Sequence, residues 1–319
     1  MPTLTRRQSG RLSLPPPLLL LLCVGLWTIV GCRETTISVL PEDIWGRRGT
    51  TDGRLQKPRA MAVDDEDNIY IVDMSARIQV FDDTGNLRRG PWRMPEFANG
   101  KPTGMSVDRS GNLAVADTHY YRILFFSPDG ELLEDKTIGG TPGNGPGEFG
   151  LLTDVVQDSK GYYYASEYGG FDRIQKFTAD GQFVTQWGVH GDRKKEFRRP
   201  QNMAIDEQDR IWVCDACNHR IQVFDTDGKL LDIWGHHGRA PGELSYPYDL
   251  VLDEQFVYIC EYGNNRVQKF TRDGTSIACW GHSGRDAGQL YNPWALVLNR
   301  AGRLLVLDTN NHRVQKINL

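Results

Sequence analysis

The sequence predicts an all-β fold, a six-bladed β-propeller in which every blade is a four-stranded antiparallel sheet. Two observations predict it. A unit of four short strands recurs six times along the chain, and the last repeat stops after its third strand while a spare fourth strand stands near the N-terminus. A lone four-stranded sheet would expose two apolar faces, and radial stacking of six sheets buries both.

The repeating unit is clearest in residues 200–235. Met203–Asp206 and Ile211–Asp215 are short apolar runs that each end in an acid. A loop follows, then Arg220–Phe224, an Asp-Gly turn, and Leu230–Trp234. Short alternating runs that are separated by Asp-, Asn- and Gly-containing turns predict antiparallel strands.

Charged residues recur in the same register. An arginine opens the third strand of every repeat, at spacings of 45 to 51 residues: Arg77, Arg122, Arg173, Arg220, Arg266 and Arg313. An acid ends the second strand at Asp73, Asp117, Glu167, Asp215, Glu261 and Asp308. The first strand ends in Asp64, Asp108, Asp158, Asp206 and Asp253, with Asn299 in the sixth repeat. Residues shared by all repeats most simply serve the repeat, so we expect each arginine to bind its acid and loop carbonyls. The alternative is a ring of charges that contacts a ligand.

The two ends of the chain predict how the ring closes. Three repeats end their fourth strand in Trp-Gly, and an unpaired copy, Ile44-Trp45-Gly46, precedes the first repeat. We expect this segment to complete the last blade. The propeller therefore spans residues 44–319.

The first residues resemble a targeting signal. Arg6, Arg7 and Arg11 precede the apolar run Leu18–Val30, which is too short to span a bilayer but suits a signal peptide. The run ends in Ile29-Val30-Gly31-Cys32, which is similar to a bacterial lipobox. We therefore predict a lipoprotein signal peptide at 1–31, lipid attachment at Cys32, a tether at 32–43, and an extracytoplasmic protein anchored to a bacterial membrane. An ordinary signal peptide, or a signal anchor with an incidental Cys32, is the alternative.

The third-strand segments carry a family resemblance. Asn218-His219-Arg220-Ile221-Gln222 and Asn311-His312-Arg313-Val314-Gln315 resemble the NHL repeat, and Asn264–Gln268 is a near variant. The resemblance implies a six-bladed propeller. Its members include sensor domains of bacterial kinases, RNA- or protein-binding domains and peptide-amidating lyases, so it implies little about chemistry.

Composition argues against nucleic acid as a partner. The net charge is −4, whereas proteins that bind polyanions usually carry a basic excess. The one basic cluster, Arg193–Arg199, reads as a solvated loop or a contact with an anionic partner. We expect a monomer.

All seven histidines fall in two loop classes, between the second and third strands or after the fourth strand. Both classes emerge on one face of a propeller, which we call the His-rich face. We predict that this face docks a protein, peptide or glycan, with these ligand-binding residues: His119, Tyr168, His219, Tyr262, Asn265 and His312. A ligand- or protein-binding module is thus the favoured function, and no residue is assigned a catalytic role.

The alternative is a metal-dependent lyase or hydrolase at the mouth of the channel. His119, His219 and His312 lie in alternate repeats, and three converging imidazoles would suit zinc. The resemblance to amidating lyases implies this arrangement, and Asp215 to His219 and Asp308 to His312 match its Asp-x-x-x-His spacing. His119 departs from it, only two residues after Asp117. The following Arg220 and Arg313 would disfavour a cation, so we expect no tight zinc site and no other cofactor.

Cys214-Asp215-Ala216-Cys217 is the one C-x-x-C motif. Cys214 shares a repeat position with Cys260 that holds small residues elsewhere, which favours a small buried hydrophobe. A Cys214–Cys217 disulfide remains an alternative in an oxidising compartment.

Overall fold

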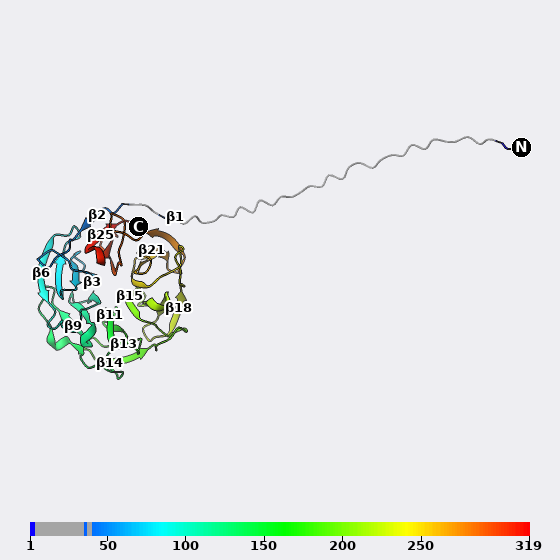
Figure 1. Ribbon diagram of the computed structural model, residues 1–319. Coiled ribbons are helices and arrows are strands. Elements are labelled where there is room, and N and C mark those ends of the chain that lie inside the picture. Colours follow the sequence, from blue (N-terminus) through cyan, green and yellow to red (C-terminus); the bar gives the residue numbers. More distant parts are fainter. Residues whose placement is uncertain (4–34, 37–39) are drawn as a thin grey trace. The chain divides into compact units, whose positions relative to one another are not determined.

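The computed structural model describes residues 1–3, 35–36 and 40–319. Within the part from Glu34 onward, the chain forms one compact unit, which Figure 1 shows as a ring of sheets. The predicted signal peptide and Cys32 lie outside the described residues, so the signal peptide, tether and anchor stay predictions. In the described part of the chain, no helix has the length and apolarity needed to cross a membrane.

The ring contains six blades, as the repeats predict. Each of the first five is a four-stranded antiparallel sheet whose strands follow the chain from the inside outward. Blade 1 is β3 (Pro58–Val63), β4 (Ile69–Asp73), β5 (Arg77–Phe81) and β6 (Leu87–Arg93); blade 2 is β7 (Gly104–Val107), β8 (Leu113–Asp117), β9 (Arg122–Phe126) and β10 (Ile138–Gly139); blade 3 is β11 (Leu151–Gln157), β12 (Tyr163–Tyr168), β13 (Arg173–Phe177) and β14 (Phe183–Trp187); blade 4 is β15 (Pro200–Ile205), β16 (Ile211–Asp215), β17 (Arg220–Phe224) and β18 (Leu230–Trp234); blade 5 is β19 (Pro247–Leu252), β20 (Phe256–Glu261), β21 (Arg266–Thr271) and β22 (Ser276–Trp280). The inner strands of neighbouring blades contact one another all round the ring and so line its central channel.

The last blade closes the ring with a strand from the other end of the chain. Blade 6 contains β23 (Ala295–Leu298), β24 (Leu304–Asp308) and β25 (Arg313–Ile317), and its outer strand is β2 (Asp43–Trp45). Ile44 pairs with Gln315 and Trp45 with Val314, so the predicted closure is confirmed. A further short strand, β1 (Thr35–Thr36), runs parallel to β22 at the outer edge of blade 5.

Short 3-10 helices interrupt several loops of the described chain. Three of them follow the second strand of blades 2, 4 and 6: η1 (Thr118–Tyr120), η3 (Ala216–Asn218) and η4 (Thr309–Asn311). The fourth, η2 (Glu134–Lys136), precedes β10. His219 and His312 directly follow η3 and η4 in the left-handed conformation, whereas His119 lies inside η1.

The core lies between the blades, in six apolar clusters that each join two neighbouring sheets. The tryptophan that ends an outer strand covers the glycine in the outer turn of the next blade. A Cβ atom on Gly228 would lie 2.6 Å from the ring of Trp187, and one on Gly274 would lie 2.7 Å from Trp234. These glycines have positive φ angles, which suit the turn and leave room for the indole.

Candidate functional site

The repeated arginines hold the blades together. In every blade the arginine that opens the third strand forms an ion pair of 2.5 to 3.1 Å with the acid that ends the second strand. Most also donate to loop carbonyls; Arg220, for example, donates to the carbonyl oxygens of Asp192, Arg193 and Glu196. The six acids are buried, and so are three of the arginines, Arg77, Arg173 and Arg266. The structure therefore confirms that these arginines bind the acids and the loop carbonyls of their own repeat.

A second device links four of the blades to the next one on the same face. The residue before the third strand has a left-handed conformation in every blade, and in blades 3 to 6 its side chain accepts a backbone N–H from the start of the following blade; these residues are Asp172, His219, Asn265 and His312. His219 Nδ1 accepts from Tyr246 at 3.1 Å, and His312 Nδ1 accepts from Lys57 at 2.9 Å. Asn265 Oδ1 accepts from Asn292 at 2.7 Å. The last-to-first contact of His312 thus reinforces the ring closure.

These hydrogen bonds decide whether the candidate zinc ligands fit a metal. A neutral imidazole has one lone pair on its ring nitrogens, and an N–H occupies the other nitrogen. In His219 and His312 that lone pair accepts a backbone N–H, which leaves a protonated Nε2 that cannot ligate zinc. Among the described residues, no three His, Cys, Asp or Glu side chains are grouped for a metal. The three histidines as they lie here do not fit a zinc site.

His119 differs from the other two histidines. In blade 2 the left-handed position belongs to Tyr121, while His119 lies two residues earlier, inside η1. Its Nδ1 is buried without a hydrogen-bond partner, against Gly100. Burial, and then the positive charges of Arg59 and Lys101, lower the pKa of His119 below its ordinary 6.5. His119 is therefore a neutral imidazole at neutral pH, next to a cation.

Two arginines from opposite sides of the ring, Arg59 and Arg199, enter the same mouth of the channel. Arg59 lies on β3 of blade 1, and its guanidinium carbon is 5.3 Å from the ring centroid of Trp294 in blade 6. Arg199 directly precedes β15 of blade 4, and its guanidinium is 4.8 Å from the ring of Tyr168 and 5.5 Å from that of Tyr248. Both arginines are only partly exposed.

Aromatic side chains complete this mouth on the side of blades 5 and 6. Tyr248 stacks on Tyr262 with ring centroids 4.5 Å apart, and Trp294 meets Tyr248 edge-on at 5.0 Å. Trp294 Nε1 is buried and has no hydrogen-bond partner. We call the set Arg59, His119, Tyr168, Arg199, Tyr248, Tyr262 and Trp294 the channel-mouth cluster.

The two guanidiniums of the channel-mouth cluster have no acid bound to them, although Asp172 Oδ1 accepts the backbone N–H of Arg199 at 2.7 Å. In the described part of the chain neither Arg59 nor Arg199 forms an ion pair, and Arg199 Nε donates to the neutral amide of Gln201. Burial lowers the pKa of the Arg59 guanidinium, and the charge of Arg199 lowers it further, while Tyr168 acts in the opposite direction. Two like charges close enough to repel, held in a half-buried aromatic setting, leave a place for an anion.

The local structure that builds this mouth is a bulge at the start of the inner strands. Pro58, Pro200 and Pro247 each begin an inner strand, and the pairing register shifts directly after them. A bulge re-aims the side chain of the extra residue. In blades 1 and 5 the residue after the proline is Arg59 or Tyr248, and in blade 6 Trp294 follows Pro293 just before β23, where the pairing is regular. The position after the blade-opening proline thus supplies much of the mouth.

Sequence reasoning found part of this cluster. Tyr168, Tyr262 and His119 were predicted as ligand-binding residues and lie in it, although no ligand contact is tested. His219, Asn265 and His312 lie outside it, in the blade-to-blade hydrogen bonds. Arg59, Arg199, Tyr248 and Trp294 were missed. One signal could have found three of them: the residue after the blade-opening proline varies from Arg to Tyr to Trp while its neighbours repeat.

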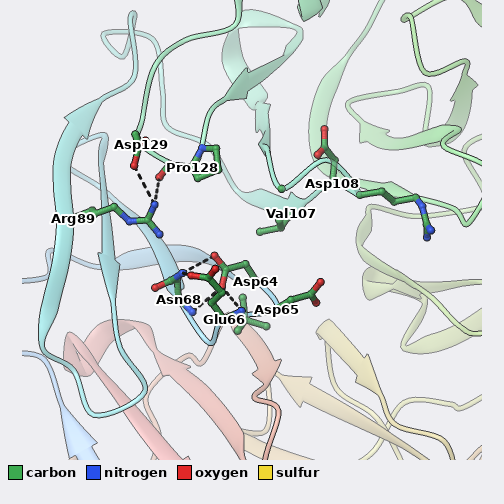
Figure 2. A pocket seen from close by; sticks show the side chains of 12 residues that line it. Asp64, Asp65, Glu66, Asn68, Arg89, Val107, Asp108, Pro128 and Asp129 are labelled. Carbon is green, nitrogen blue, oxygen red and sulfur yellow. Dashed lines mark hydrogen bonds and ion pairs between the residues drawn. The ribbon is translucent and has the colours of Figure 1, made fainter.

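A separate hollow lies at the other end of the strands, between blades 1 and 2. This pocket of about 650 Å³ is lined by Asp64, Asp65, Glu66, Asp108, Asp129 and two arginines, among others. Figure 2 shows that its polar groups largely serve each other. Asp64 accepts from Asn68 at 2.8 Å, and Arg89 pairs with Asp129 at 3.3 Å. The charged side chains of this pocket therefore stabilise the turns that form its walls.

The remaining predicted features sit as follows. On the His-rich face, a hollow of about 430 Å³ is lined by Asn265, Arg239, Arg266 and His282, among others. Cys214 is a free thiol that is completely buried, as its repeat position suggested, and Cys217 is a free, partly exposed thiol. The structure therefore contains no Cys214–Cys217 disulfide.

Comparison with known proteins gives one family match and two kinds of relatives. The NHL repeat model matches residues 197–224 and 290–317. Peptidylglycine alpha-amidating monooxygenase of Rattus norvegicus is 32% identical over 130 residues, which is 37% of this chain and 13% of the relative. The Mus musculus enzyme is 26% identical over 190 residues, 56% of this chain and 18% of the relative. The chain thus spans less than a fifth of these relatives' lengths.

Solved structures share the architecture at low identity. A streptogramin B lyase covers 90% of this chain and 96% of its own length, with a TM-score of 0.59 and 15% identity. A catalytically inactive variant of virginiamycin B lyase from Staphylococcus aureus, solved with quinupristin, has a TM-score of 0.61 and 14% identity, over 86% of this chain and 85% of its own. At this identity the likeness shows the fold alone. Together with the sheet topology, these findings identify the chain as a six-bladed β-propeller that contains NHL repeats.

Proposed function

We propose that this chain is a lyase-type enzyme whose substrate carries an anionic group, most simply a carboxylate, held at the mouth of the central channel. The observation that carries this proposal is the pair Arg59 and Arg199, two guanidiniums that share one aromatic mouth without an acid partner. Arginine is the side chain best suited to bind a carboxylate, through two parallel N–H donors.

Each kind of group in the cluster has a chemical use in such a reaction. A lyase needs a base to remove a proton and a cation to stabilise the charge that develops. His119 supplies the base, because burial and neighbouring cations keep its imidazole neutral, and Arg59 is one of those cations. The aromatic wall of Tyr248, Tyr262 and Trp294 holds the apolar part of the substrate. We assign no step to a metal, because the ring nitrogens of His219 and His312 that carry lone pairs accept hydrogen bonds from backbone N–H groups.

The relatives support this choice of reaction class. The amidating monooxygenases act, by their name, on peptidylglycine, whose free end is a carboxylate, and two solved propellers of this fold are named lyases. A peptide with a C-terminal glycine is therefore the first substrate class to test. A role in ligand binding without turnover is the second candidate, because the hollow around Asn265 on the His-rich face offers a surface for it.

Fluorescence anisotropy tests the anion site. The probes are a fluorescent tripeptide that ends in glycine with a free carboxylate, and the same tripeptide as its C-terminal amide. We expect the carboxylate form to bind at least tenfold more tightly, since a hydrogen bond to a charged group contributes about 1.5–3 kcal/mol. Arg59→Gln and Arg199→Gln should each remove that preference, and Arg239→Gln, at the separate hollow, should leave it intact. Equal binding of the two peptides by the wild type would refute the anion site.

Turnover separates the enzyme from the binding module. Because a lyase eliminates without an oxidant, the turnover substrate is the same tripeptide with α-hydroxyglycine at its C-terminus. His119 would remove the hydroxyl proton while the C–N bond breaks and the amide nitrogen takes up a proton, so mass spectrometry should show the peptide amide and glyoxylate, which His119→Gln does not form. Binding that depends on Arg59 without any product would make the channel mouth a binding site without turnover, and binding lost in Arg239→Gln instead would select the hollow around Asn265.

We also propose that the protein is a lipoprotein anchored through Cys32 to an extracytoplasmic membrane surface. The support is the apolar run that ends in Ile29-Val30-Gly31-Cys32. Two acyl chains hold a protein stably at a bilayer. The wild type should enter the detergent phase in a phase-separation assay and Cys32→Ser should stay aqueous; equal partitioning would contradict the anchor.

A further inference from the structure

Arg199 has a neutral side-chain partner, whereas the arginines of the repeat each have an acid. Arg199 Nε donates to Gln201 Oε1 at 2.9 Å, and within the described residues its side chain makes no other hydrogen bond. Arg173, Arg220 and Arg266, by contrast, each pair with a carboxylate. An amide fixes the direction of a guanidinium without cancelling its charge. Gln201 therefore leaves the terminal nitrogens of Arg199 available to an anion.

Gln201 belongs to the channel mouth by its position in the blade. It directly follows the proline that begins β15, just as Arg59 and Tyr248 directly follow the prolines that begin β3 and β19. The pairing register shifts after the proline in all three strands. The position that supplies Arg59 and Tyr248 to the mouth thus supplies Gln201 in blade 4.

The amide of Gln201 carries an N–H donor without an acceptor. Because an arginine Nε can only donate, the amide oxygen must be the atom that faces Arg199, which assigns the other end of the amide to Nε2. Gln201 is 0% exposed, and its Nε2 has no hydrogen-bond partner. The fully buried glutamines of the third strands differ from it, since each donates Nε2 to a loop carbonyl oxygen: Gln79, Gln175, Gln222, Gln268 and Gln315. An unsatisfied buried donor is unfavourable, so a ligand that brings an acceptor oxygen to Gln201 gains affinity.

The spacing of the two groups suits two neighbouring groups of one ligand. Nε2 and Oε1 of Gln201 share a carbon atom, so Nε2 lies within about 5 Å of Arg199 Nε. A carboxylate that pairs with Arg199 through two parallel N–H donors uses both of its oxygens there, and Gln201 then needs a third oxygen. One residue of extended peptide spans about 3.3–3.6 Å. The carbonyl oxygen one residue before the carboxylate is therefore within reach of Gln201.

We propose that Gln201 is a specificity-determining residue, which donates its Nε2–H to the carbonyl oxygen one residue before the carboxylate of the substrate, while its Oε1 positions Arg199. This proposal rests on the proposed anion site at the channel mouth. Acids in which an acylated nitrogen precedes the carboxylate by one carbon atom are thereby preferred over simple carboxylic acids.

Isothermal titration calorimetry of the full chain with two matched acids tests this role. N-hexanoylglycine and hexyloxyacetic acid have the same chain length and the same carboxylate, but the second has CH2–O in place of CO–NH and so lacks the carbonyl oxygen. We expect the wild type to bind N-hexanoylglycine about fivefold or more tightly, which is the contribution of one buried hydrogen bond. Equal affinity of the wild type for the two acids, including no measurable binding of either, overturns the proposal without the need for any variant to fold.

Two variants separate carbonyl recognition from the positioning of Arg199. Gln201→Met keeps a similar unbranched shape but has no donor, so it should lose the preference for N-hexanoylglycine. Gln208→Met removes an exposed amide in the turn at the other end of blade 4 and should keep the preference. Gln201→Glu supplies a carboxylate that pairs with Arg199 and cancels its charge, so both acids should bind about tenfold or more weakly.

Each variant has a result that contradicts the proposal. A preference retained in Gln201→Met, at an unchanged melting temperature, would show that another group reads the carbonyl oxygen. Wild-type affinity in Gln201→Glu would show that Gln201 does not control the charge of Arg199. The comparison of the carboxylate and amide tripeptides tests the anion site by itself, so a wild type that prefers the carboxylate tripeptide but binds the two acids equally would lose this inference and keep the proposed function.

Discussion

Trp45→Ala tests how far the stability of the ring depends on its closing strand. Trp45 is 7% exposed on β2, its ring lies 5.2 Å from that of Phe81 in blade 1, and it covers Gly85. The substitution removes a large buried side chain that joins the last blade to the first. Truncation of a buried tryptophan to alanine costs about 3–5 kcal/mol. For a domain of this size that corresponds to a fall in melting temperature of about 6–10 °C, at roughly 2 °C per kcal/mol.

The neighbouring residue provides the control. Ile44 lies on the same strand with its side chain 38% exposed, so Ile44→Thr keeps the β-branched shape and should change stability by less than about 0.5 kcal/mol. Differential scanning calorimetry of both variants measures the difference. If Trp45→Ala melts within 2 °C of the wild type, or if Ile44→Thr loses as much as Trp45→Ala, the closure does not carry the stability that its packing indicates.

Two further predictions address the glycine turns and the histidine hydrogen bonds. A positive φ at an alanine costs about 1–3 kcal/mol, and Gly228→Ala should destabilise the protein by clearly more, because the new Cβ meets the ring of Trp187. The control is Gly302→Ala, which has a similar φ and no atom within 4 Å of its Cβ and so measures the backbone cost alone. Urea unfolding of both variants gives the two free energies. Burial, and then the charges of Arg48 and Lys57, hold the pKa of His312 below 6.5, so folding stability should fall as pH drops below 6.5, where the unfolded chain binds the proton first. His312→Asn, which copies the acceptor found at the equivalent position of blade 5, should flatten that part of the pH profile of the melting temperature, and an unchanged profile would show that another group causes it.

The features that the sequence predicts correctly are those that repeat. The pairing of Arg313 with Asp308 could be expected because an arginine and an acid recur in the same register six times, and the blade count follows from the same periodicity. Ring closure by Trp45 could be expected because the last repeat lacks a fourth strand. Periodicity identifies what each blade needs for its own stability.

The features that it misses are those in which the blades differ. Arg59 and Arg199 come from opposite blades, and nothing in the local sequence indicates that they share one mouth. The bulge that re-aims Arg59 depends on pairing with the second strand, which a single repeat does not reveal. His312 is predicted to bind ligand because all histidines fall in two loop classes on one face, and that prediction stays untested; its hydrogen bond to the backbone N–H of Lys57, 255 residues away, could not be foreseen from a single repeat.

Anomalous diffraction from crystals soaked in bromide tests the central claim most directly. Bromide reports the position of an anion without any assumption about the substrate. The account predicts a bromide in contact with both Arg59 and Arg199 at the mouth of the channel, and its loss in Arg199→Gln crystals. Bromide bound at other surface arginines, with none at this mouth, would contradict the claim that the mouth is an anion site.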